Sequence, residues 1–338
     1  AFDTETDSLD PHQANLVGVS LSSKIGKACY IPLGHKSPKS LDKDKVLKKL
    51  KPLLEDPSIK KIGQNIKFDF IVLFKHGINI SSMEDTMLMS YTLDAGKNRH
   101  NMDTLSEIHL NHKTISFKEL VGTGKKEINF SEVDVDKAKD YAAEDADITL
   151  RLYKKFYKSL KDEKMINIYE IFEKPMIKIL AFMEIEGIKI DNKFLKVLSS
   201  KFLKKIEKIQ KEVYKISKKK FNIASPKQLG EILYNDLKIA HLKKTKKGSF
   251  ATSASVLEDL AFKGHKFPQL VLDWRQVSKL KNTYSDSLPG HINPQTKRVH
   301  TSFLLAATTT GRLASSDPNL QNIPIKSEDG KDIRKSFI

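Results

Sequence analysis

The sequence has little of what marks a secreted or membrane-bound chain. Cys29 is the only cysteine among 338 residues, which excludes a disulfide framework and any cysteine-rich zinc site. There is no run of about 18 apolar residues, and the chain does not open on a basic and then apolar leader, so neither a membrane span nor a signal peptide is predicted. These absences predict a protein of a reducing compartment, the cytoplasm.

Arginine is also scarce, because it supplies only 6 of the 59 basic residues, and the net charge of +17 is unevenly divided. Residues 1–150 carry 21 basic and 23 acidic side chains, a balance of −2, which leaves +19 for residues 151–338. Such a basic second half indicates a surface that binds the phosphates of a nucleic acid. A lysine excess can also reflect an AT-rich genome or a soluble surface, and charge alone leaves that alternative open.

The length predicts two or three domains. The first half alternates short β-like runs with helical ones, which is typical of an α/β fold with helices packed on a mixed sheet. We expect strands in AFDTET, NLVGVSLSS and KACYIPL, an amphipathic helix over 41–54, a strand ending at Gly63, a helix over 66–75 and a long helix over 133–161.

The second half has mainly helical patterns. A buried helix over 168–185, ended by Gly187, is predicted as a connector, and a very basic amphipathic helix follows over 192–220. Ser225 is expected to cap a short helix that begins at Pro226. Further helices are predicted over 253–262 and 267–286, a basic tip at 243–248, a hairpin after Pro289 and a polar tail over 308–324.

Three short acidic signatures follow one another in the first half. Asp3 and Glu5 are two residues apart on a predicted strand and therefore face the same side. Asp69 falls in the first turns of the helix over 66–75. Tyr141 and Asp145 are four residues apart on the long helix and therefore share a face. The neighbouring Asp147 lies on a different face from Tyr141, so Asp145 is the expected site residue.

This set matches what metal-assisted phosphodiester hydrolysis requires, about four carboxylates that hold two divalent cations roughly 4 Å apart. Asp3, Glu5, Asp69 and Asp145 supply the carboxylates, and Tyr141 is placed to orient the attacking water. Hard oxygen ligands favour Mg²⁺ or Mn²⁺ over zinc. Each pair alone is more often a solvated turn or core packing, and the ordered set of three signatures is what predicts a site.

The three signatures resemble the exonuclease motifs of the DEDDy class. The segment TGRLASSDPNLQNIP (310–324), followed by IRKSFI (333–338), resembles the start of the palm in family A DNA polymerases. Over essentially its whole length the chain resembles this family in its bacterial DNA polymerase I form. The resemblance implies a ribonuclease H-like 3′-5′ exonuclease domain (1–162), a connector helix (163–190), a helical DNA-binding thumb (191–288) and the incomplete start of an α+β palm (289–338).

The resemblance also implies individual roles. Asp3, Glu5 and Asp145 would hold the first metal, Asp3 and Asp69 the second, and Tyr141 the nucleophilic water. The implied DNA-binding residues are Leu9 and Phe117 on the terminal bases, Gln64 and Asn65 on the terminal nucleotides, Arg312 in the minor groove, and Asn319, Gln321 and Asn322 on the duplex. Core packing remains the alternative for Leu9 and Phe117, and a phosphate or surface role for Arg312. Ala314 stands where the family often has serine.

By the same resemblance the chain is expected to be a fragment, because Ala1 would fall inside the first strand and Ile338 would precede the first polymerase aspartate. Proofreading of a frayed DNA 3′ end would lie in this piece, and DNA polymerase activity in replication and repair in its full-length parent. A monomer bound to primer-template DNA in the bacterial nucleoid is expected. One alternative is a ribonuclease D-like RNA exonuclease, but such an enzyme would not contain the segment TGRLASSDPNLQNIP found here at 310–324. The other is a catalytically silent DNA-binding module.

Overall fold

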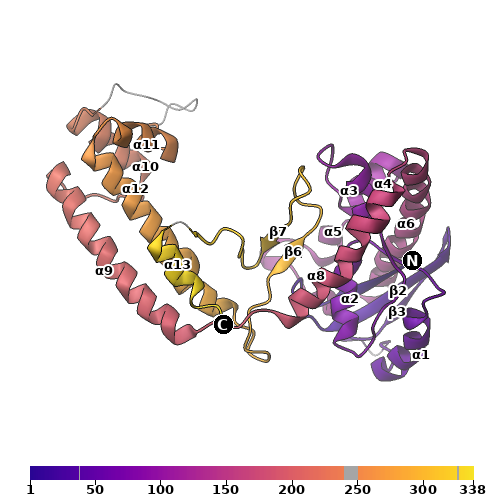
Figure 1. Cartoon of the computed structure of the whole chain (residues 1–338). Helices are drawn as coiled ribbons and strands as arrows, with labels where there is room; N and C mark the ends of the chain where they lie inside the picture. Colours follow the sequence, from indigo (N-terminus) through magenta and orange to yellow (C-terminus); the bar gives the residue numbers. More distant parts are fainter. Residues whose placement is uncertain (38, 240–249, 326) are drawn as a thin grey trace. The chain divides into compact units, whose positions relative to one another are not determined.

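The computed structural model describes residues 1–37, 39–239, 250–325 and 327–338, and the chain divides into two compact units (Figure 1). The first unit comprises Ala1–Gly187 and Thr301–Asn319, and the second comprises Ile188–His300 and Leu320–Ile338. The predicted basic tip at 243–248 lies outside the described residues. The division into four domains stays a prediction.

The strands of the first unit run in both relative directions. Strands β1 (Phe2–Thr6), β2 (Leu16–Lys24) and β3 (Lys27–Pro32) form an antiparallel sheet in that order. Strands β4 (Lys61–Gly63) and β5 (Met83–Asp85) form a separate parallel pair. With the helices packed around them, these strands confirm the predicted α/β class, but β1 to β5 form two separate sheets rather than the single mixed sheet that was predicted.

The helices predicted in the first unit form where the periodicity places them. The two predicted helices at 41–54 and 66–75 are α1 (Lys43–Glu55), which begins after the N-cap Asp42, and α2 (Ile66–Phe74). The core joins Phe2 and Val19 of the sheet to Phe70 of α2 and Phe156 of α6. The remaining helices are α3 (Thr86–Asp94), α4 (Met102–Leu110), α5 (Phe117–Val121), short 3₁₀ turns at Gly124–Lys126 and Phe130–Glu132, α6 (Val135–Asp162) and α7 (Ile166–Ile168). Of these, α3, α4, α5 and α7 were not predicted.

The predicted buried helix over 168–185 forms as a π-helical segment (Tyr169–Glu173) that continues into α8 (Lys174–Glu186) and ends at Gly187. Its apolar residues are not all buried, so that part of the prediction is wrong. Only the side carrying Ile177, Leu180 and Ala181 packs in the core, where α8 lies along α2 (Figure 1). The other side exposes half or more of each of Ile171, Phe172, Ile179 and Met183.

The second unit is mainly helical. Helix α9 (Asn192–Ser217) buries the predicted stripe, including Leu195 and Phe202, and packs against α12 (Lys266–Lys279), which continues as a π-helical segment (Leu280–Asp286). Ser225 caps α10 as predicted, its hydroxyl accepting from the amide of Gln228. The other elements are α10 (Pro226–Gly230), a π-helical segment (Glu231–Asp236), α11 (Ala254–Phe262), a 3₁₀ turn (Leu288–His291) and α13 (Glu328–Arg334).

The predicted hairpin after Pro289 forms at its base, where Ile292 pairs with Val299. The chain then enters the first unit, where β6 (Ser302–Leu304) pairs with β7 (Ala314–Ser316), and β7 lies within the predicted polar tail over 308–324. Within the described ranges, no helix is long and apolar enough to cross a membrane.

Candidate active site

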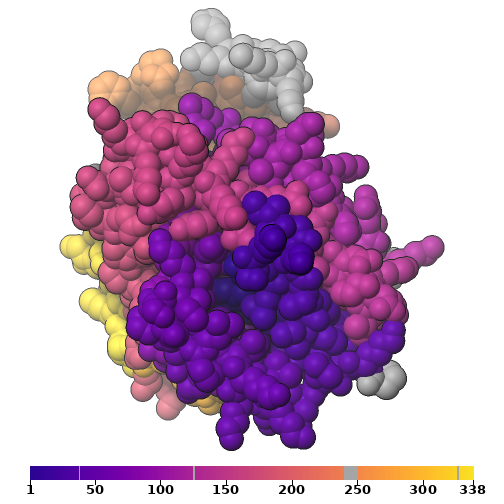
Figure 2. All heavy atoms as spheres, turned by 90° about the vertical axis from the view of Figure 1, so that its right-hand side faces the viewer, coloured from indigo at the N-terminus to yellow at the C-terminus, as the bar shows by residue number. Residues whose placement is uncertain are grey.

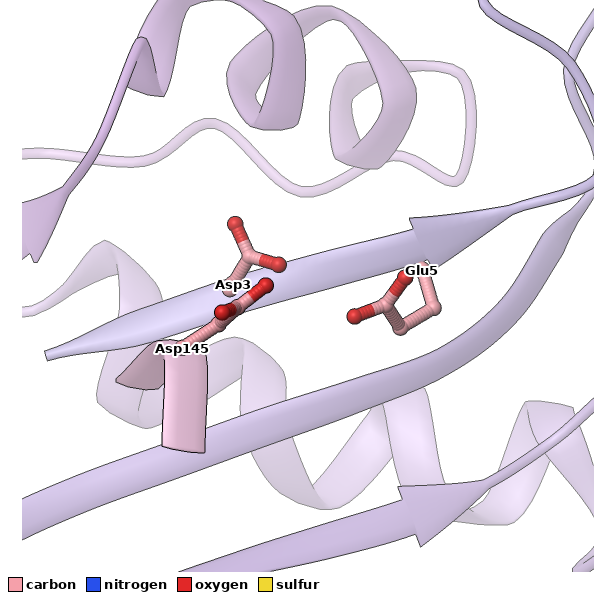
Figure 3. A group of neighbouring side chains, drawn as sticks. All are labelled: Asp3, Glu5 and Asp145. Atoms are coloured by element: carbon pink, nitrogen blue, oxygen red, sulfur yellow. The ribbon is translucent and has the colours of Figure 1, made fainter. Parts of the chain in front are cut away.

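Three of the four predicted carboxylates converge in the first unit. Asp3 and Glu5 of β1 and Asp145 of α6 each offer a carboxylate oxygen, and these oxygens all lie within 4.8 Å of one another (Figure 3). Glu5 and Asp145 are buried, with 7% and 5% of their surface exposed, and Asp3 is half-buried. We refer to these three residues as the carboxylate cluster.

Local geometry explains the convergence. Asp3 and Glu5 lie opposite Ser20 and Gly18 of β2, and a register shift follows Glu5. Their spacing of two keeps both side chains on one face of the strand. Helix α6 packs against β1, β2 and β3 and turns three fully buried alanines inward, Ala138, Ala142 and Ala146, whose small size lets the helix backbone approach closely. The indigo N-terminal residues reach the surface of the unit, bordered by purple and magenta segments (Figure 2).

The cluster is electrostatically unfavourable as it stands. Burial raises the pKa of Asp3 to about 7. Burial, followed by the charges of Asp3, Asp145 and Asp69, raises the pKa of Glu5. The Oε1 atom of Glu5 is buried and accepts no hydrogen bond from any described residue. Buried anionic oxygens that repel one another and lack donors are what a divalent cation satisfies, so the residues present fit a hard metal ion.

Asp69 takes a separate position beside the cluster. It is 2% exposed on α2, and its Oδ1 accepts the backbone N–H of Thr4 at 2.9 Å and the Thr4 hydroxyl at 2.5 Å. Burial and then the charge of Asp3 raise the pKa of Asp69, whereas the Thr4 hydrogen bonds act in the opposite sense. Asp69 is therefore tethered to the strand between Asp3 and Glu5.

Tyr141 lies beside Asp145, as the spacing of four predicts. The two side chains are hydrogen-bonded, and this bond opposes the rise in the pKa of Asp145 that burial and the charge of Asp3 produce. Burial and then the charges of Asp145 and Glu5 raise the pKa of Tyr141, so the phenol stays neutral and keeps the proton that it donates to Asp145. Its ring centroid lies 6.0 Å from that of Phe117.

Asp147 is excluded from the cluster, as its helix face predicts. Its Oδ1 accepts the backbone N–H of Gly26 at 2.6 Å, and its Oδ2 pairs with Arg151 at 2.6 Å. Asp147 therefore links α6 to the turn between β2 and β3, a structural role that its position in the sequence, two residues from Asp145, does not indicate.

Tyr30 is a neighbour of the cluster that the sequence did not single out. A Cβ atom at Gly18, which pairs with Glu5, would lie 2.1 Å from the Tyr30 hydroxyl, so only glycine leaves room for this ring. The Tyr30 hydroxyl lies 2.7 Å from Nε2 of His35, and burial and then the charge of Glu5 raise its pKa. The alternation of β3 alone cannot reveal this contact because it depends on a glycine in the adjacent strand.

The residues expected to contact a DNA end differ in how exposed they are and in whether their side chains already form hydrogen bonds. Leu9 is 93% exposed and Phe117 is 42% exposed, so the core-packing alternative is wrong for Leu9 and only partly applies to Phe117, which stacks on Phe130. Gln64 donates to the backbone carbonyl of His100 at 2.7 Å and accepts from Thr86 at 2.5 Å.

Asn65 is exposed and left-handed, with φ of 61°, at the start of α2. The four expected duplex contacts, Arg312, Asn319, Gln321 and Asn322, are all exposed. Arg312 and Asn319 belong to the first unit, whereas Gln321 and Asn322 belong to the second. Their contacts with DNA stay predictions.

An α/β unit with clustered carboxylates, followed by a helical unit, defines a candidate metal-dependent nuclease with a second, basic part. Residues 1–161 match a family described as 3′-5′ exonuclease, and residues 192–338 match DNA polymerase family A. The two matches leave only residues 162–191 uncovered. Residues 192–338 therefore carry the family A polymerase match, and they follow a segment that matches the exonuclease family.

Known relatives align along the entire chain. It is 46% identical to DNA polymerase I of Rhizobium leguminosarum and 43% identical to that of Pseudomonas aeruginosa, and it spans 35% and 38% of their lengths. Among solved structures, the POL domain of Pol1 from M. smegmatis, in complex with DNA primer-template and dNTP, matches with a TM-score of 0.83 and 27% identity over the whole chain and 54% of that structure. The chain thus spans little more than a third of the curated relatives.

Proposed function

We propose that this chain is the proofreading part of a DNA polymerase I, which removes nucleotides from the 3′ end of DNA, and that DNA polymerase activity belongs to a longer parent. The observation that carries the proposal is the carboxylate cluster, three buried or half-buried acids with oxygens within 4.8 Å of one another in the segment that matches the exonuclease family. The M. smegmatis relative bound to DNA primer-template supports DNA as the partner.

In this proposal Asp3, Glu5 and Asp145 hold one divalent cation, and Asp3 and Asp69 hold a second, Mg²⁺ or Mn²⁺. When bound, the cations would activate water and stabilise the leaving oxygen. Tyr141, kept neutral by its environment, donates its one O–H to Asp145, and its phenol oxygen would accept a hydrogen bond from the attacking water and so orient it. The tether from Thr4 keeps the Asp69 carboxylate turned toward β1.

The 3′ end of the DNA strand is proposed to reach the carboxylate cluster by passing over two exposed side chains. Leu9 and Phe117 would pack against the terminal bases, and Asn65, with an exposed side chain, would contact the terminal nucleotide. Gln64 would contribute from a position that its bonds to His100 and Thr86 already fix. A mismatched end needs less energy to leave its stack, by a few kcal/mol, so it would reach the cluster more often than a paired end.

The finer subdivision follows the same proposal. The first unit would contain a ribonuclease H-like exonuclease domain, the second a thumb that grips duplex DNA, and residues 289–338 the start of a palm. Arg312, Asn319, Gln321 and Asn322 would contact the duplex. The +19 charge of residues 151–338 supports phosphate binding by this half. In this proposal the protein is a monomer that acts on DNA in the bacterial nucleoid.

The test is digestion of 3′-labelled single-stranded and mismatched duplex DNA by the purified chain, with and without Mg²⁺. We expect metal-dependent release of mononucleotides that Asp3→Ala and Asp145→Ala reduce by at least about a hundredfold, since even partners behind a metal ligand cost 10–100-fold. Asp147→Asn is the matched control, a buried acid on the same helix outside the cluster. Tight DNA binding with no release would favour a silent DNA-binding module instead.

A further inference from the structure

The segment 301–319 is held on the first unit by a buried carboxylate and by apolar packing. Glu184 of α8 is 1% exposed and accepts the backbone N–H of Phe303 at 2.6 Å, while it also pairs with the buried Lys67 of α2. Leu305 is buried in the core of the unit, and Leu313 packs against that core. Both ends of the loop between β6 and β7 are therefore fixed, and its tip carries Arg312.

A tyrosine of α3 is inserted into that tip. Tyr91 is 4% exposed, and its hydroxyl donates to the backbone carbonyl of Thr308 at 2.6 Å and accepts the backbone N–H of Gly311 at 3.1 Å. In an ordinary four-residue turn the first carbonyl and the fourth N–H bond to each other directly. Here the Tyr91 hydroxyl bridges them, so the shape of the turn depends on a residue more than 200 positions away.

The surroundings hold both partners in place. The turn is closed on its other side because the Thr308 hydroxyl donates to the backbone carbonyl of Arg312 at 2.8 Å. Gly96, just after α3, lies so close that a Cβ atom there would be 2.8 Å from Thr309. The Tyr91 ring meets the buried His100 edge-on, with ring centroids 5.5 Å apart, which fixes the direction of the hydroxyl.

We propose that Tyr91 is a positioning residue for Arg312, so that a helix of the exonuclease segment sets the duplex contact of the polymerase segment. The inference rests on the proposed function, because Arg312 must meet duplex DNA for the positioning to matter. Arg312 itself is exposed, and the backbone from which its side chain extends is held by the Thr308 hydroxyl and by the turn that Tyr91 bridges.

The experiment is a double-variant cycle on the full chain with Tyr91→Phe and Arg312→Ala. Affinity for a duplex primer-template is measured by fluorescence anisotropy in EDTA, so that no cleavage occurs. We expect Tyr91→Phe to weaken binding about three- to tenfold, the loss that one net hydrogen bond produces. In the Arg312→Ala background the same change should have no further effect, because Tyr91 acts on binding through Arg312 and residues joined in one hydrogen-bond network are not additive. Tyr153→Phe, whose hydroxyl meets Lys60, is the matched control.

Two further measurements complete the test. Tyr91→Phe should leave Mg²⁺-dependent digestion of single-stranded DNA unchanged, and it should speed deuterium uptake by residues 305–313, where the Gly311 N–H loses its acceptor. An equal loss of duplex affinity with and without Arg312, or no loss at all, would overturn the proposal. If the unaltered chain digests no DNA, the exonuclease function fails while the binding cycle still decides the role of Tyr91.

Discussion

The backbone N–H and the hydroxyl of Thr4 both donate to one oxygen of Asp69, at 2.9 and 2.5 Å. We predict that Thr4→Val, which keeps the shape and removes the hydroxyl, lowers exonuclease activity about tenfold and raises the Mg²⁺ concentration needed for half-maximal rate, because partners behind metal ligands cost 10–100-fold. Digestion rates measured against Mg²⁺ concentration test this.

Thr6→Val is the control for that prediction. It removes a hydroxyl from the same strand, one that donates to the backbone carbonyl of Ser8 and to no carboxylate. An unchanged Mg²⁺ requirement in Thr4→Val would contradict the assignment of Asp69 as a metal ligand.

The raised pKa values of the carboxylate cluster predict how stability depends on pH in the metal-free protein. A folded carboxyl with a pKa above its unfolded value binds protons more tightly when folded, so stability is highest below about pH 4 and falls as pH rises through the folded value. For Asp3 that value is about 7. In EDTA we therefore expect the unaltered chain to lose about 5 °C of Tm between pH 5 and pH 8 relative to Asp145→Asn.

The same experiment has a metal arm. Mg²⁺ competes with protons for the cluster, so it should raise Tm more at pH 8 than at pH 6 in the unaltered chain and have little effect in Asp145→Asn. Calorimetry at pH 6 and pH 8, with and without Mg²⁺, measures these changes in Tm. An equal Mg²⁺ effect at both pH values would show that the cluster does not bind the cation.

Phe117 is half-exposed and stacks on Phe130 with the rings nearly parallel, at 4°. We predict that Phe117→Ala weakens capture of a single-stranded 3′ end about tenfold and therefore raises KM, because a base stacked on an aromatic ring is worth 1–3 kcal/mol. Ile108→Ala removes another exposed apolar side chain, 56% exposed, and should leave KM unchanged. Equal KM values for the two variants would remove Phe117 from the strand path.

Helix α9 carries exposed lysines that form no ion pair with any described residue, among them Lys204, Lys208, Lys211 and Lys215. Changing these four to glutamine should weaken duplex binding and make the slope of log affinity against log salt shallower by about one unit per lost phosphate contact. The control changes Lys24, Lys27, Lys48 and Lys49, exposed lysines of the first unit, to glutamine. Equal slopes in the two variants would show that net charge alone, and no site on α9, governs binding.

Local periodicity predicted much of the fold because hydrogen bonding and side-chain direction within one element depend on near neighbours. The strands β1 to β4, the helices α2, α6 and α9, and the cap at Ser225 lie where it placed them. Periodicity wrongly predicted that α8 is buried. Apolar residues lie on all sides of this helix, so the local pattern does not indicate which side packs against α2. Periodicity also gave the tail over 308–324 no strand, because β7 is too short to show alternation and depends on its partner β6.

Spacing along the chain is enough to tell which acids share a face, since intervals of two on β1 and four on α6 fix the direction of each side chain without any knowledge of the partner element. Tertiary packing brings the two elements together, tethers Asp69 to Thr4, and places opposite Glu5 a glycine that admits Tyr30. It also places residues 301–319 on the first unit, where Tyr91 bridges their turn. Those relationships join residues tens to hundreds of positions apart, and packing rather than periodicity selects them.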